Sequence, residues 1–132
     1  METSQVAYWT VTDLSFDDAV AKCRESLAAE GFGVLTEIDV QATMKQKLDV
    51  DGEPYLILGA CHPPSAHRAL SAVPGVGVLL PCNVTVSVED GQTVVRAMDP
   101  ASAMGILDEP ELEEVGADVG ARLQRVVASL ES

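Results

Sequence analysis

The sequence is poor in basic residues. It contains 8 Lys and Arg against 21 Asp and Glu in 132 residues, which gives a formal net charge of -13 at pH 7 and a pI near 4.2. A chain this acidic repels phosphate backbones and anionic lipid surfaces. It also lacks the run of about 20 apolar residues that spans a bilayer, because its longest stretches of low charge are residues 55–61 and 75–88. We therefore expect neither nucleic acid nor a membrane as a partner.

Cysteine is scarce and does not occur in pairs. The three residues Cys23, Cys61 and Cys82 include no CxxC pair, which favours reduced thiols over a disulfide framework. The segment Met1–Thr12 has no Lys or Arg and no continuous apolar run, so it does not read as a secretory signal. We expect a cytoplasmic protein.

Motifs of common active sites are also missing. The sequence has no GxGxxG after a strand, no GxxxxGK[ST], no GxSxG and no HExxH, so it gives no support to dinucleotide binding, a P-loop, an esterase elbow or a zinc protease. With only two histidines, a serine triad has no basis either. We assign no catalytic residue, no metal and no cofactor.

What is present is the material of one globular domain. The chain is 47% apolar, and a fold of this size hides roughly two-thirds of the surface of its unfolded chain. No repeat, low-complexity block or Gly/Ser linker divides it. We expect a single domain over residues 1–132, of the α+β class, with two layers: a mainly antiparallel sheet and helices packed on one face.

Hydrophobic periodicity and turn signals define the expected elements. Ser15 and Asp39 are suited to cap helices, and Gly31 stands where a helix would end in the left-handed conformation. The predicted order is strand 4–11, which includes Gln5, helix 16–27, strand 32–38, helix 40–48, strand 55–61, helix 63–71, strand 76–88, strand 92–98 and a helix from 110 to 130.

The clearest alternation runs from Val76 to Val88, where every even position is apolar. Pro81 cannot donate to a ladder, so this strand is expected to bulge or to lie at an edge there. Asp90–Gly91 is typical of a hairpin turn, which makes the next strand an antiparallel neighbour. Gly116 and Gly120 border the apolar stripe of the last helix and are expected to let it approach the sheet closely.

Charge is nearly absent from the middle of the chain. Between Pro54 and Val88 the only ionic residue is Arg68. The predicted strand Tyr55–Cys61 is apolar on both faces, which is typical of a strand covered on both sides. We expect a homodimer formed through the sheet. The alternative is that helices of one chain cover both faces.

One group of residues has side chains suited to chemistry, and it lies around the predicted strand ends: Cys61, His62, Cys82 and Asn83. Cys61 lies where a strand gives way to a helix, a position at which the helix dipole favours a thiolate. However, Pro63 and Pro64 remove two of the N–H donors that would stabilise an anion there.

The other members of the group have plain structural interpretations. Cys82 is in phase with the valines of its strand and is expected to lie in the core as a small apolar residue. Asn83 points to the opposite face, where it would orient a ligand or satisfy irregular backbone. The alternative of a zinc site would use four ligands: Cys61, Cys82, His62 and His67. It requires a strand register that the alternation of apolar residues does not favour. Packing, a reactive thiol and metal binding remain as alternatives.

Three segments carry a resemblance to a known family: YLILGACHP at residues 55–63, AHRAL at 66–70 and VLLPCNV at 78–84, followed by Asp99 and Pro100. In their order and spacing they resemble the bacterial and archaeal family catalogued as domain of unknown function 302. The resemblance implies a compact two-layer α+β fold, an antiparallel sheet carrying helices, and frequent dimers. It implies no reaction. The position of His62 is usually Asn in that family.

Taken together, these features favour a non-catalytic, dimeric domain that binds a small ligand or a partner near the four residues Cys61, His62, Cys82 and Asn83. The rival hypotheses are a thiol-dependent enzyme or redox protein that uses Cys61, and a metal-handling protein.

Overall fold

The computed structural model describes residues 1–4 and 6–132. Within them, six strands form one sheet in the order β1-β2-β6-β5-β4-β3, and every neighbouring pair is antiparallel. The strands are β1 (Glu2–Thr3), β2 (Ala7–Thr12), β3 (Gly33–Asp39), β4 (Tyr55–Cys61), β5 (Cys82–Glu89) and β6 (Gln92–Met98). The helices are α1 (Phe16–Ala29), α2 (Val40–Leu48), α3 (Pro63–Ala72), α4 (Pro100–Met104) and α5 (Pro110–Ala128), with 3-10 segments η1 (Pro74–Leu79) and η2 (Gly105–Leu107).

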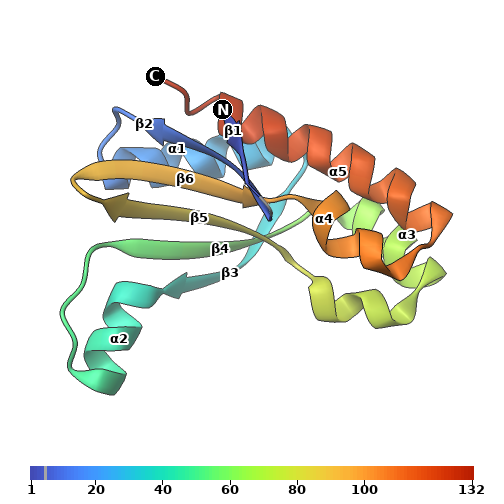
Figure 1. Ribbon diagram of the computed structural model, residues 1–132, viewed down its shortest axis with the longest axis horizontal. Helices are drawn as coiled ribbons and strands as arrows, with labels where there is room; N and C mark the ends of the chain where they lie inside the picture. The colour runs from blue at the N-terminus through green and yellow to red at the C-terminus, as the bar shows by residue number, and fades with distance from the viewer. Residues whose placement is uncertain (5) are drawn as a thin grey trace.

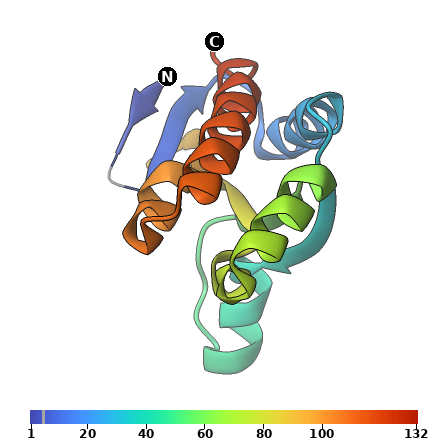
Figure 2. The same cartoon turned by 90° about the vertical axis from the view of Figure 1, so that its right-hand side faces the viewer.

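The helices cover one face of the sheet. Helix α1 contacts β3, β5 and β6, and α5 contacts β2 and β6, so the two lie side by side over the strands (Figures 1 and 2). Helix α3 packs on α5 beyond the end of the strands. The predicted class, a two-layer α+β fold with an antiparallel sheet and helices on one face, is confirmed.

The strand register separates the two faces of the sheet. Residues directly opposite each other in a ladder share a face, and one such row runs through Tyr8, Ala97, Val84 and Leu58. These four are buried under the helices. The adjacent row points to the other face, which no helix among the described residues covers: Trp9, Arg96, Thr85, Ile57 and Ile38. We call this second side the open face.

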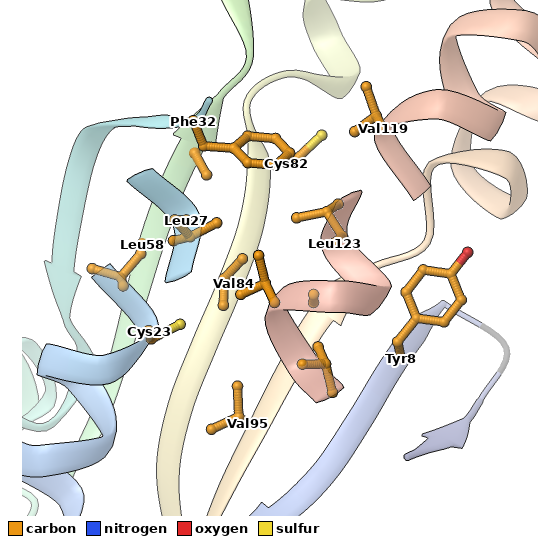
Figure 3. Close-up of a cluster of buried hydrophobic side chains, with 14 of the residues drawn as sticks. Tyr8, Cys23, Leu27, Phe32, Leu58, Cys82, Val84, Val95, Val119 and Leu123 are labelled. Atoms are coloured by element: carbon orange, nitrogen blue, oxygen red, sulfur yellow. The ribbon is translucent and has the colours of Figure 1, made fainter. Parts of the chain in front are cut away.

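The core lies between the sheet and helices α1 and α5 (Figure 3). Cys23 and Leu27 come from α1, Leu123 from α5, and Val84 and Val95 from the central strands; each of these five is fully buried. The apolar stripe predicted for the last helix is therefore confirmed as its buried side. In an acidic chain, this apolar layer provides the main favourable free energy of folding.

Local signals place α1 and its exit as predicted. The Ser15 hydroxyl accepts a hydrogen bond from the Asp18 N–H at 3.1 Å, which caps the helix. At the other end Gly31 has φ +84°, a conformation that glycine adopts without steric cost. The Phe32 N–H then donates to the Leu27 carbonyl at 2.9 Å. The chain turns there and enters β3.

The predicted strand 76–88 is only half right. Residues 82–89 form β5, but Pro74–Leu79 form the 3-10 segment η1. Strand β5 pairs with β4 on one side and β6 on the other, so a proline without an N–H cannot lie within it. The strand therefore begins after Pro81, and the expectation of a bulge or an edge strand at Pro81 was wrong.

Two smaller expectations also need correction, and one helix was missed. The first long strand is β2, over Ala7–Thr12, and Gln5 of the predicted strand lies outside the described residues. Helix α4 was not predicted. It packs against α5, and a Cβ on Gly116 would lie 3.7 Å from the backbone nitrogen of Ala101, so this glycine approaches α4 rather than the sheet. Gly120 does approach the sheet, at Tyr8.

Strand β3 is an outer strand of the sheet, and it is irregular. Its register against β4 shifts between Val34 and Thr36, so that Leu35 is displaced and 67% exposed.

Among the helices of the described residues, none has the length and apolar character needed to cross a membrane.

Candidate functional site

The end of β4 and the start of α3 bring two of the predicted residues together. Cys61 is the last residue of β4, and His62 is the N-cap residue of α3. Pro63 and Pro64 occupy the first two helical positions, as expected for residues without an N–H. Next along the sheet, Cys82 opens β5 and lies opposite Ala60 in the ladder.

A cavity of about 340 Å³ opens beside these residues, between α3, η1 and α5. Val115 and Val119 of α5, Met104 of α4 and Phe32 close it on the inner side, and these side chains are buried. Leu70, 40% exposed, lies at its rim. Three of the four predicted residues line it: Cys61, His62 and Cys82. The described residues that line it include no charged side chain.

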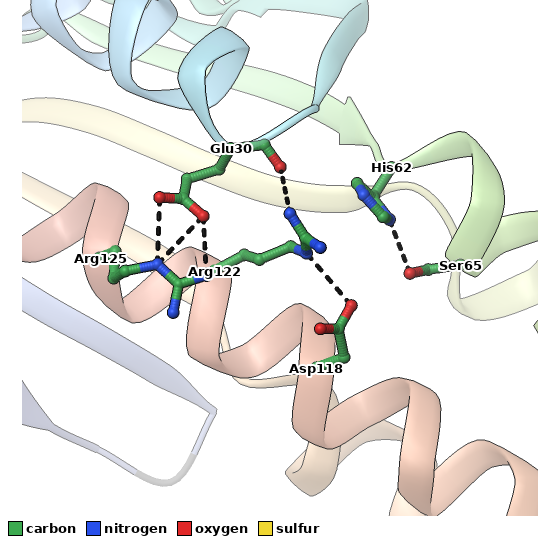
Figure 4. Close-up of polar contacts among 6 residues, drawn as sticks. All are labelled: Glu30, His62, Ser65, Asp118, Arg122 and Arg125. Carbon is green, nitrogen blue, oxygen red and sulfur yellow. Dashed lines mark hydrogen bonds and ion pairs between the residues drawn. The ribbon is translucent and has the colours of Figure 1, made fainter.

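His62 is held by contacts on both sides of its ring. Its Nδ1 lies 2.7 Å from the Ser65 hydroxyl (Figure 4), and its ring meets Phe32 edge-on at a centroid distance of 5.7 Å. A Cβ on Gly31 would lie 3.1 Å from His62 Cδ2. Position 31 therefore needs glycine for its backbone angle and also for the space that the imidazole occupies.

Arg122 of α5 lies beside this histidine. Its Nη1 donates to the Glu30 carbonyl at 3.0 Å, and its Nε donates to Asp118 at 3.1 Å (Figure 4). Burial lowers the pKa of His62, and the positive charge of Arg122 lowers it further, against a smaller opposing effect of Asp118. The imidazole is therefore neutral at pH 7.

Comparison with known proteins places this arrangement in a family. The family model described as domain of unknown function DUF302 matches residues 8–130. The chain belongs to the DUF302 family. Its fold is similar to the crystal structure of an uncharacterized conserved DUF302 protein from Bacillus stearothermophilus, with a TM-score of 0.89, 31% identity, and coverage of 95% of this chain and 98% of that one. No curated protein is significantly similar. The resemblance seen in the sequence is confirmed.

The thiols of this DUF302 chain differ in their surroundings. Burial raises the pKa of the Cys82 thiol to about 11, and the neighbouring Cys61 adds to the rise, so Cys82 carries its proton at neutral pH. Cys61 is half-buried. The hydrogen bonds of the described residues include none between Cys61 and His62, whose Nδ1 is engaged by Ser65. In this arrangement the Nδ1 of His62 is paired with the Ser65 hydroxyl and not with the Cys61 thiol.

The predicted metal alternative has no ligand set in the described part of this DUF302 chain. No three His, Cys, Asp or Glu side chains there lie close enough together to hold a metal ion. His67 is exposed on α3 and does not line the cavity, so it is separated from Cys61 and Cys82.

Asn83 is the predicted residue that the structure separates from the others. It lies opposite Gly59 in the ladder, on the open face, and it is exposed. Sequence reasoning missed the wall that α5 provides through Val115 and Val119, as well as Ser65. Their apolar or small side chains carried no signal beyond core packing; the Ser65 position, three residues after His62 at a helix start, was the one local hint.

Replacing His62 with Asn is expected to remove a pH dependence of stability. The folded-state pKa of His62 is lowered, so the unfolded chain takes up a proton first as the pH falls below about 6.5. The wild-type free energy of unfolding should therefore decrease as the pH falls from about 7 toward the folded pKa. Urea unfolding between about pH 7.5 and 5 measures it.

The matched control for this variant is His67→Asn, which removes an exposed histidine from the same helix. It should keep the wild-type decrease, whereas the slope of His62→Asn should be smaller. Equal slopes in wild type and His62→Asn would contradict the prediction.

Proposed function

We propose that this DUF302 chain is a non-catalytic, homodimeric module that binds a small apolar ligand in the cavity beside Cys61, His62 and Cys82. The observation that carries the proposal is the cavity itself. Its volume of about 340 Å³ lies at the lower end of the roughly 300–1,000 Å³ found for ligand sites. Its apolar wall is interrupted by few polar groups, as in such sites.

The lining favours an uncharged ligand rich in hydrocarbon. The described side chains around the cavity carry no formal charge, since His62 is neutral at pH 7. A charged ligand would lose its hydration without gaining a partner ion, which is costly. One hydrogen-bonding group on the ligand is provided for, because the Ser65 hydroxyl has two lone pairs and a proton and uses part of this capacity on His62.

Several features support binding rather than catalysis. Cys82 keeps its proton at neutral pH, and His62 bonds to Ser65 rather than to either thiol. The N-terminal turn of α3 has prolines at its first two positions, so it offers fewer N–H donors for a developing anion.

The homodimer is proposed from the sheet. Strand β4 is an interior strand of the sheet, and its side chains Leu56 and Leu58 are buried in the core on the side that the helices cover. The open face carries half-buried apolar side chains, among them Trp9, Val11 and Ile57. A second copy that covered them would explain why a middle strand of an acidic protein is apolar on both sides.

Titration with N-phenyl-1-naphthylamine, an uncharged apolar dye that brightens in apolar surroundings, tests the cavity. Wild-type protein should give a saturable rise in fluorescence. Ala66 lines the cavity from α3 and is half-buried, so Ala66→Phe should fill part of the space and weaken binding by about tenfold or more, equivalent to at least about 1.4 kcal/mol.

The control variant is His67→Phe, which places the same ring on the exposed side of α3. It should bind the dye like wild type, and circular dichroism should show both variants to be folded. Absence of saturable binding, or equal affinity for Ala66→Phe and wild type, would refute the proposed site.

A further inference from the structure

Helix α2 is the one long helical segment in the described residues without a buried side chain. Met44 is 42% exposed, Leu48 is 66% exposed, and Val50, just after the helix, is 49% exposed. Figure 1 shows α2 at the opposite end of the molecule from α3 and α4. An isolated helix of nine residues is marginal in water. An apolar stripe of this kind gains stability only when something covers it.

The open face complements α2, because it is a sheet surface on which no helix of the described residues packs. Its net charge is small: Arg96 Nη2 donates to Glu89 at 3.0 Å and the two charges cancel, which leaves the single acid Glu2, opposite Trp9 in the ladder. Within the described chain, Thr85 Oγ1 on this face is buried and has no hydrogen-bond partner. Ile38 and Ile57 lie opposite each other here, and Ile38 is two residues before α2. The apolar surface of the face thus continues into the helix.

We infer that α2 of one copy packs on the open face of a second copy, and that the second copy returns the same contact. This inference rests on the homodimer proposed above and specifies the surfaces that form it. Each chain carries both halves of the contact, a helix without a sheet and a sheet face without a helix. A two-fold axis satisfies both halves at once and leaves no further copy to add.

Charge favours a second copy as the occupant. Helix α2 contains Lys45 and Lys47 and no acidic residue, in a chain whose net charge is -13. The end of the sheet at which β2 stops, β4 starts and the β5–β6 hairpin turns carries three acids: Asp13, Glu53 and Asp90. Lys45 is paired within its own chain, with Asp49 at 2.8 Å and Asp51 at 3.1 Å. Lys47 is therefore the cation of α2 that these acids on another copy attract, although the two chains as wholes repel each other.

The surface area that a stable dimer interface buries also requires α2. Five paired strands of about seven residues make a face of about 24 Å by about 23 Å, or roughly 550 Å² before side-chain relief is counted. A stable interface buries about 800 Å² on each partner. The sheet face alone falls short of this area, and α2 with the segment after it provides the remainder.

The experiment compares wild type with Met44→Asp/Leu48→Asp by sedimentation and by the fluorescence of Trp9, the only tryptophan, which lies on the open face. Wild type should be a dimer. The double variant should dissociate, with a rise of about 100-fold or more in the dimer dissociation constant. Its Trp9 emission should move to longer wavelength as the face meets water.

A charge placed elsewhere provides the control. Val78 on η1 is 88% exposed, and Val78→Asp should remain a dimer. If circular dichroism shows that the aspartates unfold α2, the double variant Met44→Gln/Leu48→Gln is used instead. It should also raise the dimer dissociation constant. A wild-type monomer at all concentrations would refute the proposed homodimer and this inference together. A dimer that both α2 variants leave unchanged would refute this inference alone.

Discussion

Replacing Leu58 with alanine is expected to lower the free energy of unfolding by about 3 kcal/mol, within the range of about 2–5 kcal/mol for large-to-small changes in a core. Leu58 is fully buried and lies in β4 on the side covered by the helices. It belongs to the same core cluster as Cys23 and Leu27 of α1 (Figure 3). The substitution removes apolar contacts and leaves a cavity. Strand β4 is hydrogen-bonded to β3 and β5, so it cannot easily move to close that cavity. Urea unfolding at a fixed protein concentration measures the loss.

The control is a leucine on the neighbouring strand. Leu35 is 67% exposed, so Leu35→Ala should change the free energy of unfolding by less than about 0.5 kcal/mol. A loss below about 1 kcal/mol for Leu58→Ala would contradict the assignment of β4 to the centre of the core.

Replacing Gly59 with alanine is expected to destabilise the protein by about 2 kcal/mol, although alanine adds a single methyl group. A Cβ at this position would lie 2.1 Å from Thr36 Oγ1 and 2.8 Å from Pro81 Cγ. Both distances are shorter than van der Waals contact. Both the Thr36 side chain on β3 and Pro81 in the segment before β5 must shift, and overpacking of this kind costs about 1–3 kcal/mol. Thermal and urea unfolding of the variant measure the effect.

A second substitution separates the two clashes. Thr36→Ala removes the closer of the two atoms but leaves Pro81 in place, so the double variant Thr36→Ala/Gly59→Ala should recover part of the loss. The coupling between the two changes should be favourable by about 1 kcal/mol in a double-mutant cycle. Coupling near zero would show that Thr36 does not cross over Gly59.

The elements that could be predicted from the sequence are those with local determinants. Helix α1 has its cap in Ser15 and its exit in Gly31, and helix α5 has an apolar stripe of several turns. The hairpin at Asp90–Gly91 is a two-residue signal, and the structure has both residues at positive φ. In each case the interaction that decides the structure lies within a few residues of the signal.

The segment before β5 could not be predicted in this way. Val76 and Val78 would share a face in a strand, but Val76 is fully buried and Val78 is 88% exposed. The alternation of valines with Gly75 and Gly77 imitates a strand pattern. What decides against it is the pairing of β5 on both sides, which is a property of distant strands and excludes Pro81.

The candidate site shows the same division. Cys61 and His62 are adjacent in sequence, and Cys82 lies on the neighbouring strand, so their convergence follows from one correct strand pairing. Val115 and Val119 reach the cavity from a helix more than 30 residues further along the chain. Only the packing of α5 on α3 creates the space between them, and this packing leaves no local trace in the sequence.

The irregular course of β3 has a consequence for growth of the sheet. An outer strand with free N–H and C=O groups is a template for further strands and so for fibrils. In β3 the register shift at Leu35 interrupts that template, and Glu37, paired with Arg24 at 2.8 Å, places charge beside it. The irregular course of β3 is therefore expected to oppose ribbon-like growth of the sheet along this edge.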